Sequence, residues 1–122
     1  MRVRDTDDFW RCIRQLEGKT VCTLVQHRPN KIVKVTDHEV LIEGRASRPR
    51  REDISCVYRC LCEKGRVVAR ELYGPNSLIG HPQARRAGRI ILAIVAHAFP
   101  DEIEVVGGGG AEEQSGIRLK AL

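Results

Sequence analysis

The side chains best suited to chemistry in this 122-residue chain are two groups of arginines. One group falls within seven residues and the other within five: Arg45, Arg48, Arg50 and Arg51, then Arg85, Arg86 and Arg89. Guanidinium groups present forked donors that match phosphate oxygens. A helix whose first turns carry arginines is also typical of recognition helices that enter the major groove. These seven arginines therefore predict a nucleic-acid-binding surface, with DNA as the expected partner.

Two other interpretations of the arginines stay open. They can form a solvated face that balances acidic segments, or reflect a GC-rich genome rather than a binding surface. If the arginines do not bind nucleic acid, the chain is expected to be a protein-interaction module or accessory subunit. A face of small residues, Ala84, Ala87 and Gly88, suits close packing against a second copy in a homodimer.

No constellation of residues predicts catalysis, a metal site or a cofactor. Five cysteines and four histidines are present: Cys12, Cys22, Cys56, Cys60, Cys62, His27, His38, His81 and His97. None forms the CxxC knuckle of structural zinc sites, and no local signature pairs a thiol with an imidazole. Glycines 107–110 are not followed by the Lys-Ser/Thr helix of a phosphate loop. We therefore predict buried structural thiols and a chain that is not an enzyme.

Composition and charge limit the classes of protein to which the chain can belong. The formal net charge is +5, the pI is about 9.2, and 42% of residues are hydrophobic, as expected for one small globular domain. The N-terminus lacks a secretory hydrophobic region, and the longest apolar run, 90–99, is too short to span a membrane. These features predict a cytoplasmic protein with reduced thiols. Aromatic residues are few, so binding to nucleic acid is expected to be mostly electrostatic.

Hydrophobic periodicity and turn residues indicate the elements that would position the arginines. Helices are predicted over residues 6–17, 52–64 and 82–98, and strands over 20–25, 32–35, 40–42 and 103–106. Residues 67–72 fit a short strand or a short helix. The first arginine group lies in a loop between the third strand and the second helix. The second group lies in the first turns of the long helix, whose apolar residues form one stripe.

The order of these elements predicts an α+β fold: an antiparallel three-stranded meander packed on three helices, winged-helix-like in its second half. Residues 1–106 are expected to form one domain. Residues 107–122 are expected to be a glycine-rich linker and a flexible tail.

The core positions also carry a resemblance. The segment from Gly18-Lys19-Thr20 to Val40-Leu41-Ile42, the Ile54…Leu61…Gly65-Arg66-Val67 stretch and the Arg89…Phe99-Pro100 helix resemble a small bacterial α+β module. That module occurs alone or appended to restriction-type and other DNA-acting proteins. The resemblance covers roughly residues 17–106 and implies a DNA-associated role. It transfers no functional residue, because the matching positions are core positions.

Overall fold

The fold is α+β, as the sequence predicts. A computed structural model of the chain describes residues 6–23, 28–45, 48–72, 88–106 and 116–120. The helices are α1 (Thr6–Arg14), α2 (Arg51–Lys64), the short 3-10 helix η1 (Ala69–Leu72) and α4 (Gly88–Ala98). The strands are β1 (Thr20–Cys22), β2 (Pro29–Val35), β3 (Val40–Ile42), β4 (Arg66–Val68), β5 (Ile103–Val106) and β6 (Gly116–Leu119).

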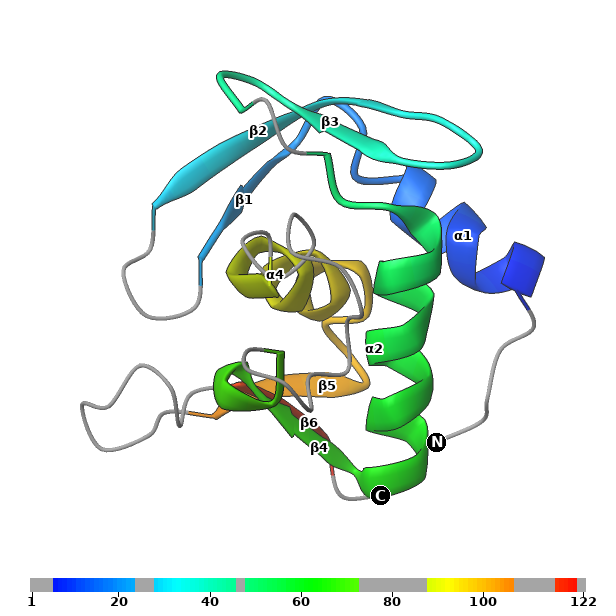
Figure 1. Cartoon of the computed structure of the whole chain (residues 1–122), viewed down its shortest axis with the longest axis vertical. Coiled ribbons are helices and arrows are strands. Elements are labelled where there is room, and N and C mark those ends of the chain that lie inside the picture. The colour runs from blue at the N-terminus through cyan, green and yellow to red at the C-terminus, as the bar shows by residue number, and fades with distance from the viewer. Residues whose placement is uncertain (1–5, 24–27, 46–47, 73–87, 107–115, 121–122) are drawn as a thin grey trace.

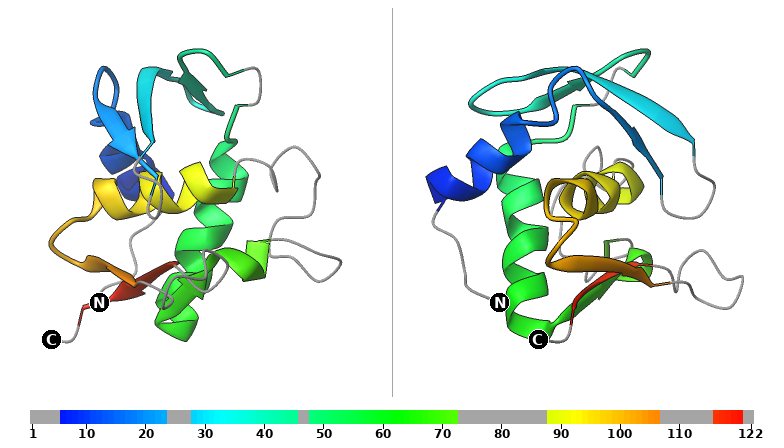
Figure 2. Two further views of the ribbon diagram at one scale, coloured as in Figure 1. Left: turned by 90° about the vertical axis from the view of Figure 1, so that its left-hand side faces the viewer. Right: turned by 180° about the vertical axis from the view of Figure 1, so that it is seen from behind.

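The strands form two antiparallel sheets at opposite ends of the molecule (Figures 1 and 2). The first sheet, in the order β1-β2-β3, is the predicted meander. The second sheet, in the order β4-β6-β5, is not among the predicted features. Of its strands, only β5 is predicted as a strand, while β4 is one of two alternatives and β6 lies in the predicted tail. The segment after α2 is both of the structures considered for it, a short strand followed by a 3-10 turn.

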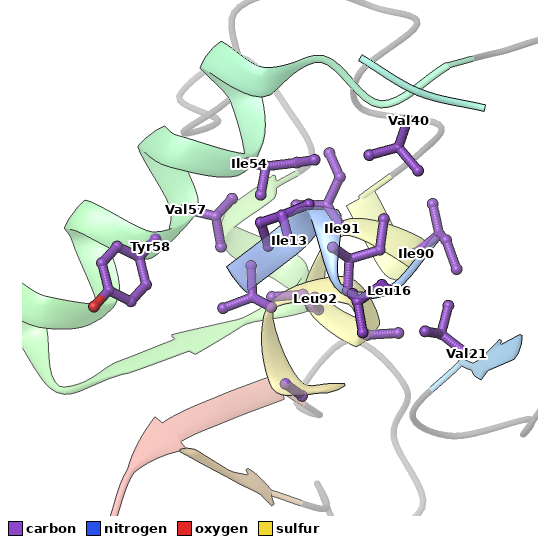
Figure 3. Close-up of a cluster of buried hydrophobic side chains, with 14 of the residues drawn as sticks. Ile13, Leu16, Val21, Val40, Ile54, Val57, Tyr58, Ile90, Ile91 and Leu92 are labelled. Carbon is purple, nitrogen blue, oxygen red and sulfur yellow. The ribbon is translucent and has the colours of Figure 1, made fainter. Parts of the chain in front are cut away.

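Helix α4 lies between the two sheets and packs against α2 and α1 (Figure 1). The seven consecutive residues from Ile90 to Ala96 are all buried, so the helix has no solvent-facing side over two turns. Figure 3 shows Ile90, Ile91 and Leu92 among side chains from α1, α2, β1 and β3. The residues of the predicted apolar stripe that lie in this span, Ile90, Ile91, Ile94 and Val95, are buried as expected. Burial extends beyond the stripe to Leu92, Ala93 and Ala96, because the helix is covered from several sides.

The predicted flexible tail is wrong for residues 116–119. These residues form β6, the central strand of the second sheet, and Ile117 is completely buried between its partners Val67 and Val105. A four-residue strand that is paired on both sides needs little periodic pattern of its own, because its neighbours supply the hydrogen bonds and the apolar contacts.

The second helix begins and ends where its sequence signals predict. Helix α2 stops at Gly65, whose φ of 80° is left-handed and whose N–H donates to the Leu61 carbonyl. Among the described helices, none is both long and apolar enough to cross a membrane.

Candidate nucleic-acid interface

Three of the four arginines of the first predicted group pair with carboxylates of the same chain. Arg48 pairs with Glu39 at 3.0 Å and Arg50 with Glu52 at 3.4 Å, and both arginine side chains are exposed. Exposed ion pairs stabilise by only about 0–1 kcal/mol, so a phosphate can compete for these two guanidinium groups. Arg45 is exposed in the turn after β3.

Arg51 has a structural role instead. Its side chain is only 24% exposed, pairs with Asp7 at 3.3 Å and donates to the Asp37 carbonyl oxygen. Its guanidinium carbon also lies 5.3 Å from the ring centroid of Trp10, a cation–π distance. These contacts join α1, α2 and the β2–β3 turn, so the guanidinium group of Arg51 is expected to contribute less to phosphate contacts than those of Arg48 and Arg50.

The second predicted group can be placed only at its last member. Arg85 and Arg86 lie outside the described residues. Arg89 is exposed in the first turn of α4 and takes part in an interaction within the chain. Because the following turns of α4 are buried on every side, the described part of this helix cannot lie in a groove as a recognition helix does. The convergence of the two groups on one surface stays a prediction, and the winged-helix character is not confirmed.

Positive charge is instead concentrated in the first sheet. Residues 18–50, here called the basic sheet region, contain seven Lys and Arg residues and three Asp and Glu residues. Their net charge of +4 supplies most of the +5 of the whole chain. The described residues of this region include all ten of these charged side chains.

Five of the seven cations have no carboxylate partner in the described part of the chain: Lys19, Arg28, Lys31, Lys34 and Arg45. All five are exposed. Four of them were missed by sequence reasoning, which weighed runs of adjacent arginines. The signal that could have found them is the summed charge of the predicted meander.

A β-bulge in β2 sets which of these side chains point outward. The β2–β3 register shifts by one residue between Ile32 and Lys34, so Val33 is the extra residue. The burial of β2 alternates up to Ile32, then has two exposed residues, then returns to buried Val35. The bulge thus keeps Lys31, Val33 and Lys34 on the solvent side while returning Val35 to the core.

The solvent side of this sheet faces away from α4, and no other described helix or strand covers it (Figure 1). Besides the lysines it carries Val33, 52% exposed, and the half-buried Leu41, which pairs with Lys34. Two acids lie on this side: Glu43, which is opposite Lys31 and donates its backbone N–H to the Lys31 carbonyl, and Glu39, which pairs with Arg48. The surface is therefore a mainly cationic sheet face with a small apolar centre and two acidic side chains.

Among the described residues, no cluster of three or more potential metal ligands occurs. All five cysteines are partly buried rather than fully buried. Burial raises the pKa of Cys60, with further increases from neighbouring Cys56 and Glu63. Burial also raises the pKa of Cys62, against a lowering hydrogen bond with Tyr58. Raised pKa values keep thiols protonated at neutral pH and poorly nucleophilic. The imidazole of His97 makes a structural contact, because its Nε2 accepts a hydrogen bond from the backbone N–H of Cys22 at 3.4 Å.

No protein-family model, curated protein or solved structure matches this chain. The resemblance to a bacterial DNA-associated module therefore stays a prediction.

Proposed function

We propose that the chain binds nucleic acid through the basic sheet region, by electrostatic contacts with phosphate groups. The observation that carries the proposal is the set of five exposed cations in this region without a carboxylate partner among the described residues. A cation that has no internal partner can contact a phosphate without first breaking an ion pair. Neutralising phosphates releases condensed counterions, which is the main source of sequence-independent affinity.

The test is the salt dependence of DNA binding, measured by fluorescence anisotropy with a labelled short duplex. Five phosphate contacts would give a slope of log K against log salt of about −4.5. The double variant Lys31→Gln with Lys34→Gln removes two of these contacts, so its slope is expected to be shallower by about 2. Its affinity at low salt is expected to fall by at least tenfold.

A matched control removes the same charge elsewhere. Arg59 on α2 and Arg66 on β4 are exposed, lie outside the basic sheet region and form no ion pair within the described chain. The double variant Arg59→Gln with Arg66→Gln is expected to keep the wild-type slope. Conversely, Glu43→Gln is expected to strengthen binding, because it removes the acid beside Lys31. Equal losses in the two double variants, or a salt-insensitive wild type, would overturn the proposal.

A second candidate function, self-association, is favoured by one exposed residue of the second sheet. Val105 lies opposite the buried Ile117, on the core-facing side of β5, yet is 52% exposed. It lies on an outer strand of this sheet as described, and an uncovered apolar edge is a common pairing surface. Size-exclusion chromatography of wild type and Val105→Lys tests it: a dimer that the variant converts to a monomer supports this function. Of the small-residue face predicted for a homodimer, Ala84 and Ala87 lie outside the described residues.

A further inference from the structure

The aromatic rings of the described chain are buried in the core and do not lie on the solvent side of the basic sheet region. Phe9, Tyr58 and Phe99 stack on one another with ring centroids 4.5–5.8 Å apart, and Trp10 lies beside Phe9. Each of these four side chains is at most 4% exposed. None is available to stack on a base.

This burial matters for the kind of nucleic acid that the sheet can hold. Proteins that bind single strands on a sheet use exposed rings, and each stacked base contributes about 1–3 kcal/mol. On the solvent side of the basic sheet region, the positions at which such rings would stand are occupied by Lys31, Val33, Lys34 and Leu41. These side chains supply charge and a small apolar contact but no π face.

The types of cation also favour contacts with phosphate over recognition of bases. Lysine is a compact point charge on a flexible stem, suited to phosphate rather than to bidentate recognition of a base edge. Three of the five unpaired cations in the described basic sheet region are lysines. The buried α4 leaves no described recognition helix to enter a groove and select a sequence.

We infer that the basic sheet region binds the phosphate backbone of double-stranded nucleic acid, in preference to single strands and without sequence selection. The inference rests on the proposed function and names its ligand class. A duplex presents two phosphate strands at high linear charge density, whereas a single strand releases fewer counterions per contact. Without stacking to compensate, the single strand is the weaker ligand.

The experiment compares three probes by anisotropy at one salt concentration: two short DNA duplexes of unrelated sequence, and one strand of the first duplex alone. Both duplexes are expected to bind equally within about threefold, and the single strand at least tenfold more weakly. A single strand that binds as well as the duplexes, or a strong preference for one duplex, would overturn the inference and leave the proposed function standing. Salt-insensitive binding of every probe would instead remove the proposed function.

A variant that adds the missing ring separates a lack of stacking from other causes. Val33 is exposed between the two lysines on the bulge, so Val33→Tyr places a ring on the sheet face without filling the core. Its single-strand affinity is expected to rise about tenfold, with little change for duplex, because one stacked base supplies that gain. Gln15→Tyr, at an exposed and uncharged position outside the basic sheet region, is the control and is expected to change neither. No gain in the Val33 variant would contradict a binding site at this face.

Discussion

A Cβ atom placed on Gly116 of β6 would lie 2.0 Å from the carbonyl oxygen of Val67 on β4. Real Cβ atoms do not approach backbone so closely, and backbone in the middle of a sheet cannot move aside as a side chain can. Gly116→Ala is therefore expected to push β4 and β6 apart and to lower the free energy of unfolding by about 3 kcal/mol. Urea denaturation followed by circular dichroism measures this loss.

Gly44 provides the control for this substitution. It has a left-handed φ of 77°, but nothing lies within 4 Å of the position of its Cβ. Gly44→Ala thus strains only one residue's backbone and is expected to cost about 1 kcal/mol. If the two variants lost equal stability, the close packing of β6 against β4 would be contradicted.

The contrast between β6 and the first sheet explains which parts of the fold the sequence could predict. The strands β2 and β3 and the helix α2 carry their own signals, namely alternating or helical apolar positions and glycines at their ends. The strand β6 carries almost none. Its sequence Gly-Ile-Arg-Leu follows a glycine-rich segment. Ile117 pairs with Val67, 50 residues earlier, and with Val105, 12 residues earlier, and these neighbours stabilise the strand. Local pattern cannot indicate such distant pairing.

Replacing Arg51 separates its structural contacts from nucleic-acid binding. Arg51→Lys keeps the charge but loses the planar group that lies over Trp10 and bridges to Asp7 and the Asp37 carbonyl. The free energy of unfolding is expected to fall by about 1 kcal/mol. Because Trp10 is the only tryptophan in the chain, its fluorescence reports the loss directly. DNA affinity is expected to stay within twofold of wild type.

The comparison variant for Arg51 is Arg45→Gln, which removes an exposed cation of the basic sheet region. It is expected to leave stability unchanged and to weaken DNA binding. The opposite pattern, with Arg51→Lys losing binding at full stability, would contradict the smaller contribution to phosphate contacts expected of Arg51.

The candidate site was only partly predictable, for a related reason. Arginines adjacent in sequence are conspicuous, but adjacency at a strand-to-helix junction sends successive side chains in different directions. Arg50 and Arg51 accordingly pair with Glu52 and Asp7, on different elements. The lysines of β2 are separated by apolar residues in the sequence. They lie on one face only because of strand alternation and a β-bulge, and no residue pattern predicts that bulge.

Glu17 is expected to stabilise the sheet at the end of β1. The Thr36 N–H donates to the Glu39 carbonyl oxygen, toward β3. The preceding Val35 N–H therefore points to the opposite side of β2, beyond the residue at which β1 begins. There it donates to Glu17 Oε1 at 2.9 Å. Glu17→Ala is expected to lower the free energy of unfolding by about 1 kcal/mol. Glu17→Gln keeps an acceptor oxygen and is expected to lose less than half of that; equal losses in a urea titration would contradict the role of this hydrogen bond.

The partly buried thiols of Cys60 and Cys62 are expected to make the fold sensitive to alkaline pH. Burial raises the pKa of Cys60 and of Cys62 in the folded chain, while unfolding returns them to the ordinary thiol value of about 8.5. The folded state therefore favours the protonated thiols. The resulting stability is fully present below the ordinary pKa and is lost as the pH rises through the raised values.

The urea midpoint of wild type, kept under reductant, should fall between neutral pH and about pH 10. A Cys60→Ala and Cys62→Ala double variant removes both titrating groups at the cost of a constant packing loss, so its midpoint should fall less steeply. The Lys64–Glu71 pair, which is the main cause of the raised pKa of Lys64, remains in both proteins, and Cys60 is the last and smallest of the causes that act on this pKa. Parallel pH profiles would show that these thiols titrate alike in the folded and unfolded chains.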